Sequence, residues 1–182
     1  SGVGLYGLSM LYLWAGSLQF DALAAQFVVD GTEPLPLIAM GFVLVGFGFK
    51  VSAAPFHFAA PDAYAGASSP VAGILATASK AMGIIGLLRM LLIVASPEAS
   101  EDGTVWLTLL GVLSIITMTW GNIAALGSKN PKRMLAYSSV AHAGYMLAAI
   151  TAIGAWNWDA SLAGDGGESA VAVLTALIFH LI

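Results

Sequence analysis

Long stretches without a charged residue constrain this chain more than any other feature. They run from residue 1 to 20, 34 to 49, 103 to 128 and 134 to 158. About 20 apolar residues suffice to cross the hydrocarbon core of a bilayer as a helix. Leu, Ala, Ile and Gly run continuously through these stretches, whereas the strands of a membrane barrel alternate in polarity. The sequence therefore predicts an all-α integral membrane protein, a polytopic helical bundle.

Composition supports this class and excludes several others. Apolar residues make up 59% of the chain, charged residues 9%, and the mean hydropathy is +0.89. The net charge of −4 is spread over the connections and forms no basic face, which excludes nucleic acid as a partner. The chain has no cysteine, so it can form neither disulfides nor thiolate-held iron–sulfur clusters. Any redox cofactor must therefore lie on a partner.

Charges, Pro and Gly divide the chain into six predicted membrane helices within a single helical region, residues 1–182. We place them at about 3–20, 35–54, 70–95, 104–126 and 131–153, with the sixth from 168 onward. Residues 19–29 suggest an interfacial amphipathic segment. Pro55 lacks a backbone donor and clashes with the preceding turn, so the second helix should break near it.

The distribution of basic residues predicts the orientation of these helices. Lys129, Lys132 and Arg133 cluster in one short connection, whereas the connections at 21–33, 98–102 and 159–168 are acidic. The positive-inside rule places the 127–133 turn in the cytoplasm. Counting helices back puts the 55–69 connection on the same side.

Ionisable residues in the middle of apolar segments are the main indication of function. Lys50, Lys80, His142 and His180 each lie near the centre of a different segment. At about 1.5 Å per residue, Lys80, His142 and His180 lie roughly 15–18 Å into a core about 30 Å thick, and Lys50 lies slightly deeper. A charge there costs about 2.5–3.5 kcal/mol even on lenient scales, so such residues usually mark a proton or ion path. Buried amines and imidazoles can bind and release protons without a metal, which makes these four residues candidate relay stations.

Structural explanations compete with this hypothesis. The lysines could form ion pairs, although no acidic residue of this chain lies at matching depth. A histidine could satisfy a backbone carbonyl. Pro55, His57, Pro61 and Asp62 lie in a proline-rich connection, and we expect them to hold its geometry rather than to conduct protons. Tyr137, Ser138 and Ser139 could form hydrogen bonds between helices.

Two groups of short motifs carry a resemblance to a known family. The first is GFGFKVSAAPFH at 46–57, PDAY at 61–64 and ATASK at 76–80; the second is GNIAAL at 121–126, KRMLAYSS at 132–139 and HAGY at 142–145. The first group resembles the antiporter-like membrane subunits of respiratory complex I, and the second is most similar to subunit N of the bacterial NADH-quinone oxidoreductases. The resemblance covers nearly the whole chain.

The resemblance implies roles for particular residues. Lys50 matches the lysine on the family's broken helix, Lys80 the lysine on the next helix, and His142 a histidine further along the hydrophilic axis. A glutamate on an earlier helix and a later lysine are not in this sequence, so we expect the chain to be the central part of a longer subunit. This chain departs from the family pattern at two places. Ala59 and Ala60 occupy the positions before Pro61 and Asp62 where the family is rich in Trp, and His180 occupies a position where the family has Tyr.

The sequence therefore predicts a proton-translocating membrane-arm subunit of NADH:quinone oxidoreductase. The resemblance implies no cofactor in this chain, with NADH, FMN, iron–sulfur clusters and quinone on partner subunits. It further implies other membrane subunits of the complex as partners, protons as the transported species, and a multi-pass location in the bacterial inner membrane. A subunit of a multisubunit Mrp-type cation/proton antiporter and a structural membrane scaffold are the alternatives.

Overall fold

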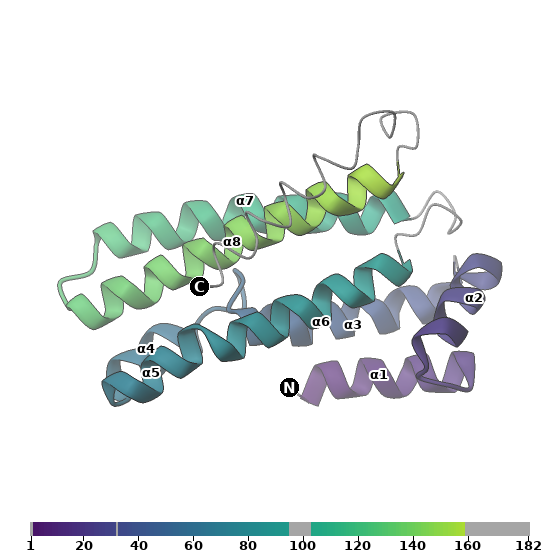
Figure 1. The fold of residues 1–182 in the computed structure, drawn as a ribbon, viewed down its shortest axis with the longest axis horizontal. Coiled ribbons are helices and arrows are strands. Elements are labelled where there is room, and N and C mark those ends of the chain that lie inside the picture. The colour runs from purple at the N-terminus through teal and green to yellow at the C-terminus, as the bar shows by residue number, and fades with distance from the viewer. Residues whose placement is uncertain (1, 32, 95–102, 159–182) are drawn as a thin grey trace.

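The computed structural model describes residues 2–31, 33–94 and 103–158, which fold entirely as α-helices and connections. The helices, drawn in Figure 1, are α1 (Gly2–Ala15), α2 (Phe20–Asp30), α3 (Pro34–Val51), α4 (Ala59–Gly66), α5 (Ser69–Ala76), α6 (Ala78–Val94), α7 (Gly103–Leu126) and α8 (Pro131–Trp158). The all-α class predicted from the uncharged stretches is thereby confirmed for the described residues. The predicted sixth helix, from 168 onward, lies outside them.

The helices form two associated groups. α7 and α8 lie side by side as an antiparallel pair, while α1 packs on α3 and α3 packs on α6 (Figure 1). The α7–α8 turn ends at Asn130, whose side-chain oxygen accepts a hydrogen bond from the Lys132 N–H at 3.0 Å. This is an N-cap, followed by Pro131 at the first helical position, where its missing N–H costs nothing. Local sequence therefore determines where α8 begins.

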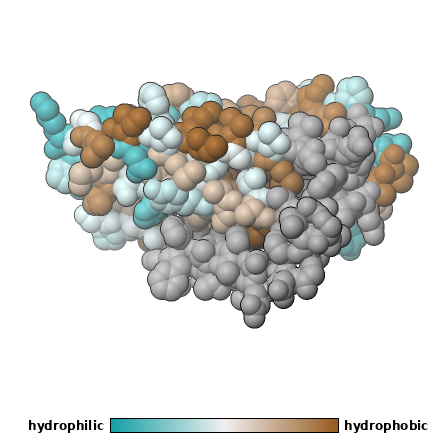
Figure 2. All heavy atoms as spheres, turned by 90° about the horizontal axis from the view of Figure 1, so that it is seen from above, coloured by the Kyte–Doolittle hydropathy of each residue, from teal (hydrophilic) through white to brown (hydrophobic). Residues whose placement is uncertain are grey.

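A hydrophobic core joins the two groups. It contains Leu11 of α1, Met40 of α3, Leu87 of α6, Leu110 of α7 and Leu147 of α8, each almost completely buried. Other large apolar side chains point outward: Leu13 is 77% exposed and Met82 73%. A water-soluble protein would bury such residues, whereas a bilayer accommodates them. Figure 2 shows hydrophobic residues in patches along the upper part of the visible face, and the most hydrophilic residues towards its two ends.

Three described stretches are long and apolar enough to cross a membrane: Pro34–Val51, Ser69–Leu91 and Trp106–Leu126. α1 is apolar but shorter. α8 has 28 residues, and it carries Lys132 and Arg133 in its first turn. The prediction of several membrane helices is therefore supported, and the number six only loosely.

The predicted break in the second helix is present, but Pro55 does not end the helix. α3 ends at Val51 because Ser52 adopts a left-handed conformation, with φ of 63° and ψ of 39°. The Ala53 N–H then donates to the Gly48 carbonyl at 2.8 Å, which is the bonding pattern of a Schellman ending. Pro55 follows three residues after Ser52 in a cis peptide bond.

Three further predictions were wrong in detail. The first helix stops at Ala15 rather than residue 20, since Gly16 takes φ of 69° and its N–H closes the last turn onto Tyr12. The 55–69 connection contains α4. The helix expected at 70–95 is divided at Thr77, whose hydroxyl donates to the Gly73 carbonyl at 2.9 Å, a contact that bends helices.

The cytoplasmic turn predicted from the basic residues lies at the same end of the molecule as α4 (Figure 1). Arg133 pairs with Asp62 at 3.0 Å, and the Lys132 ammonium donates to the Ala67 carbonyl at 3.3 Å. The prediction that residues 127–133 and 55–69 share one side agrees with this arrangement.

Close packing of α7 on α8 generates a stability prediction. A methyl group on Gly121 would lie 2.7 Å from the backbone nitrogen of Ala141, whereas one on Gly111 would lie 3.6 Å from the Thr151 methyl. We expect Gly121→Ala in the full-length protein to reduce stability by about 1–3 kcal/mol through overpacking. Gly111→Ala is the matched control on the same helix. Thermal denaturation in detergent checks this, and equal midpoints for the two variants would contradict it.

Candidate functional site

Lys80 is the charged residue that the described structure buries most completely. It lies near the middle of the 23-residue stretch Ser69–Leu91, and only 2% of its surface is exposed. Its ammonium donates to the Ser139 carbonyl at 2.6 Å and to the Ser139 hydroxyl at 2.7 Å. The Tyr64 ring centroid lies 6.0 Å from the same nitrogen, at the limit of a cation–π contact. The amine is therefore held by α8 and approached by α4.

Neutral oxygens, rather than a carboxylate, accept the hydrogen bonds of Lys80. Asp62 is the described residue that forms an ion pair, and its partner is Arg133 on the surface. The ion-pair explanation for Lys80 therefore finds no partner among the described residues. A neutral amine can keep its contact with Ser139, because a serine hydroxyl can donate as well as accept. This arrangement accommodates both protonation states of the lysine.

Lys50 occupies the last turn of α3, beside the break, and its side chain is exposed. Its stem packs on α6 at Gly83, where an added methyl group would lie 3.1 Å from the lysine Cγ. Gly83 is one turn beyond Lys80 on α6, so the stem of Lys50 meets α6 about one turn from Lys80. The absence of a side chain at Gly83 provides the room for this approach.

Lys50 borders a pocket of about 200 Å³. Ser52, Phe56, Tyr64 and Ser79 contribute to its walls. Because Ser79 directly precedes Lys80, this pocket reaches the helix that carries the second lysine. We call it the Lys50 pocket.

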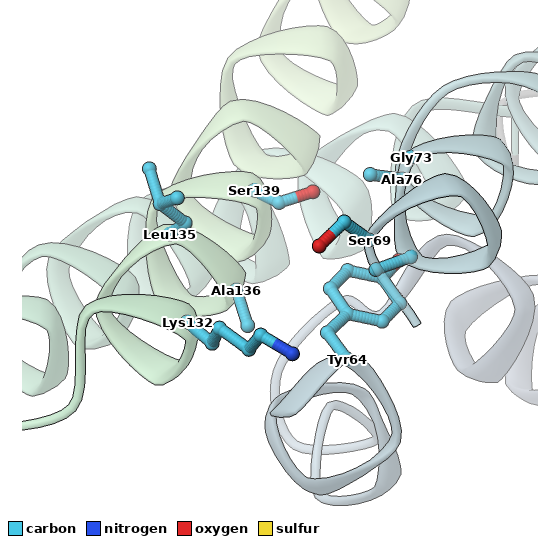
Figure 3. A pocket seen from close by; sticks show the side chains of 9 residues that line it. Tyr64, Ser69, Gly73, Ala76, Lys132, Leu135, Ala136 and Ser139 are labelled. Carbon is cyan, nitrogen blue, oxygen red and sulfur yellow. The ribbon is translucent and has the colours of Figure 1, made fainter. Parts of the chain in front are cut away.

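A second pocket, of about 250 Å³, lies between α4, α5 and α8. Figure 3 shows Lys132 and Ser139 on α8 facing Tyr64 and Ser69 across it. Ser139 is the residue that holds Lys80, so the pocket connects the surface near Lys132 with the immediate surroundings of the buried amine. We call it the Ser139 pocket.

Thr117 of α7 fastens the broken segment. Its hydroxyl oxygen accepts a hydrogen bond from the Ala54 N–H at 3.0 Å, and the hydroxyl donates to the Leu113 carbonyl at 2.6 Å. Both Ala54 and Thr117 are buried, so this N–H has no water to bond. The contact fixes the segment that follows Lys50 against the α7–α8 pair.

The histidines are placed differently from the lysines. His142 lies one turn beyond Ser139 on α8, but its side chain is exposed and does not line the Ser139 pocket; its ring lies 5.8 Å from that of Tyr145. His180 lies outside the described residues. The structure thus brings the stem of Lys50 to α6 about one turn from Lys80 and places His142 on a helix that contacts Lys80.

The residues expected to hold loop geometry have more varied settings. His57 is buried and stacks on Phe58 with centroids 5.0 Å apart; within the described residues its Nδ1 has no hydrogen-bond partner. Burial lowers the pKa of this imidazole. Asp62 and buried Pro61 belong to α4 rather than to a loop, and Pro55 is exposed. Asp62 joins α4 to α8 through Arg133, so it positions a helix.

Sequence reasoning missed two residues of the site and underrated a third. Tyr64 was part of a recognised motif but had no role assigned, and Thr117 carried no signal in the sequence. Ser139 was considered only as a residue that could bond between helices, which it does. Burial raises the pKa of the Tyr64 phenol, and a hydrogen bond with Ser139 opposes that rise. The described residues contain no group of three or more His, Asp or Glu side chains that could hold a metal.

Thr117 generates a second stability prediction. Thr117→Val keeps the side-chain shape but leaves the buried Ala54 N–H unpaired, which should cost about 1–3 kcal/mol. Thr119→Val is the matched control, because the exposed Thr119 hydroxyl bonds the Ile115 carbonyl of its own helix. Denaturation of the full-length variants in detergent measures the difference. Equal losses of stability would mean that Thr117 does not anchor the break.

Comparison with known protein families gives one match over most of the chain. A family model described as "NADH:quinone oxidoreductase/Mrp antiporter, TM" matches residues 1–165. Among curated proteins, NADH-quinone oxidoreductase subunit N 2 of Roseiflexus castenholzii is 42% identical over 174 residues, covering 93% of this chain and 34% of that protein. Subunit N of Heliobacterium modesticaldum is 47% identical over 147 residues, covering 81% and 30%. The chain therefore spans about a third of the length of these relatives.

Solved structures have the same arrangement of helices. A chain of respiratory complex I from Thermus thermophilus with bound aureothin superposes with a TM-score of 0.65 at 40% identity, covering 82% of this chain and 30% of that one. A chain of an archaeal membrane-bound sulfane sulfur reductase superposes with a TM-score of 0.73, covering 86% of this chain and 33% of that one. Its identity is 22%, so it supports the fold alone.

Proposed function

Because this chain belongs to the NADH:quinone oxidoreductase/Mrp antiporter transmembrane family, we propose that it is the central part of a proton-translocating subunit of NADH:quinone oxidoreductase. The names of its relatives favour subunit N in particular. The complete subunit would span a bacterial cytoplasmic membrane, with residues 127–133 on the cytoplasmic side and other membrane subunits of the complex around it.

The setting of Lys80 is the observation that carries the proposal. An amine in the middle of a membrane-crossing stretch is costly. Here it is buried, its hydrogen bonds among the described residues go to neutral oxygens, and it is adjacent to a pocket. Helix packing alone is served well by apolar or neutral side chains. A lysine whose partners tolerate both of its protonation states is suited to taking up and releasing a proton.

The described residues suggest an order of roles. Water in the Ser139 pocket can exchange protons with the Lys80 amine, and Ser139 holds that amine in place. Lys50, beside Gly83 and its own pocket, is the second station. His142, one turn beyond Ser139, would continue the path beyond the two lysines. NADH oxidation, with its FMN, iron–sulfur clusters and quinone, would belong to partner subunits.

The proposal predicts a loss of proton translocation when either amine is removed. We expect Lys80→Ala and Lys50→Ala to reduce NADH-driven proton uptake into membrane vesicles at least about tenfold, since a positioned proton carrier commonly contributes that much or more. Uptake is measured per assembled complex. Lys129→Ala, in the exposed α7–α8 turn, is the matched control and should pump normally.

A charge-preserving variant separates a relay from a structural charge. Lys50→Arg keeps a positive group at an exposed position, but a guanidinium does not release its proton. The relay therefore predicts that Lys50→Arg pumps as poorly as Lys50→Ala. Normal pumping by Lys50→Arg would overturn the relay role of this residue and favour a scaffold.

The Mrp-type antiporter is the second candidate, because the family description names both classes of protein. The two differ in their energy source. Sodium-coupled proton exchange in the absence of NADH, lost in Lys80→Ala, would favour the antiporter. Proton uptake that requires NADH and a quinone favours the oxidoreductase.

A further inference from the structure

Tyr64 occupies a special position between the two pockets. It lines both the Lys50 pocket and the Ser139 pocket, and no other described residue lines both. Figure 3 shows its ring, carried by α4, facing α5 and the serines of the Ser139 pocket. Tyr64 therefore lies where the surroundings of the two lysines meet.

The phenol bonds to the helical turn just before Thr77, where α5 and α6 meet. Its hydroxyl donates to the Leu75 carbonyl at 3.2 Å, in the last turn of α5 before the interruption at Thr77. Hydroxyl–oxygen bonds most often measure about 2.7–2.8 Å, so this one is long and easily released. Lys80 follows the interruption by three residues, so the phenol bonds to the same irregular segment that leads to the buried amine.

The position of the Tyr64 ring also depends on the charge of Lys80. The ammonium lies 6.0 Å from the ring centroid, and a cation is attracted to an aromatic face whereas a neutral amine is not. Contact with Ser139, which bonds Lys80, joins the hydroxyl to the same network. A change in the protonation of Lys80 therefore changes what holds Tyr64 in place.

The helix that carries Tyr64 is itself held by exposed polar contacts with α8. These are the ion pair of Asp62 with Arg133 and the bond from Lys132 to the Ala67 carbonyl. Exposed contacts of this kind stabilise a structure weakly. Irregular connections border α4 at 52–58 and 67–68.

We propose that Tyr64 is a gate between the Lys50 pocket and the Ser139 pocket, closed by its ring and latched by its hydroxyl on the Leu75 carbonyl. The inference rests on the proposed proton relay and adds its regulation. The closed ring keeps the two lysines from exchanging protons freely. Loss of the positive charge on Lys80 weakens the attraction on the ring and lets the gate open.

The test uses the complete complex reconstituted in vesicles, with proton permeability measured in the absence of NADH. Tyr64→Ala joins the two pockets, and we expect the passive proton leak to rise several-fold and the pumping yield per NADH to fall. Tyr64→Phe keeps the ring but removes the latch, so its leak should be intermediate. Tyr12→Ala, at an exposed position of α1, removes an aromatic ring elsewhere and should not leak.

Two further variants separate a gate from a packing defect. Phe49→Ala enlarges the Lys50 pocket alone, because Phe49 does not border the Ser139 pocket, and it should not raise the leak. Adding Lys80→Ala to Tyr64→Ala should abolish the proton leak, because the double variant lacks the Lys80 amine that carries the proton. A leak that persists in the double variant would overturn the gate.

The outcomes also distinguish a failure of the proposed gate from a failure of the proposed proton relay on which it rests. If Lys80→Ala stops pumping while Tyr64→Ala and Tyr64→Phe behave like Tyr12→Ala, the gate is wrong and the relay stands. If the lysine variants pump normally, the relay itself is wrong. Native gel electrophoresis of the purified complex reports assembly for every variant. If Tyr64→Ala does not assemble, Tyr64→Phe is the variant that tests the gate.

Discussion

The burial of one amine, that of Lys80, organises the functional part of this structure. A charged group in an apolar interior needs hydrogen-bond partners, and Ser139 supplies two oxygens from the facing helix. That requirement places α6 against α8 with Tyr64 of α4 beside them. The Ser139 pocket forms where these elements meet, so the position of the amine also determines where water can approach it.

Helix interruptions recur close to the lysines, and the exposed backbone groups are used. α3 ends one residue after Lys50, and the N–H of Ala54 that follows is bonded by Thr117. The α5–α6 interruption lies three residues before Lys80, and the Leu75 carbonyl beside it accepts the Tyr64 hydroxyl. Irregular backbone at membrane depth persists only where protein or enclosed water satisfies it. Both interruptions therefore belong to the site and not merely to the fold.

Prediction from sequence succeeded for features that depend on neighbouring residues and failed where distant ones intervene. Uncharged runs located the helices, and the helix predicted to begin at Pro131 does begin there as α8. The break after Lys50 was expected from Pro55, yet Ser52 makes it, in a left-handed conformation that a serine rarely adopts. Thr77 gave no sign of interrupting a helix, because its effect depends on a hydroxyl bond to the preceding turn.

The sequence by itself determined the all-α membrane class, the apolar stretches, the basic turn and the family, because hydropathy and motifs depend only on residues that are close together in the sequence. Only the tertiary structure decided that Lys80 bonds Ser139, that Tyr64 lines two pockets and that His142 is exposed on α8. The physical reason is that these contacts depend on how each helix is rotated against its neighbour. Close approaches such as Gly121 against Ala141 set that rotation, and no single segment specifies them.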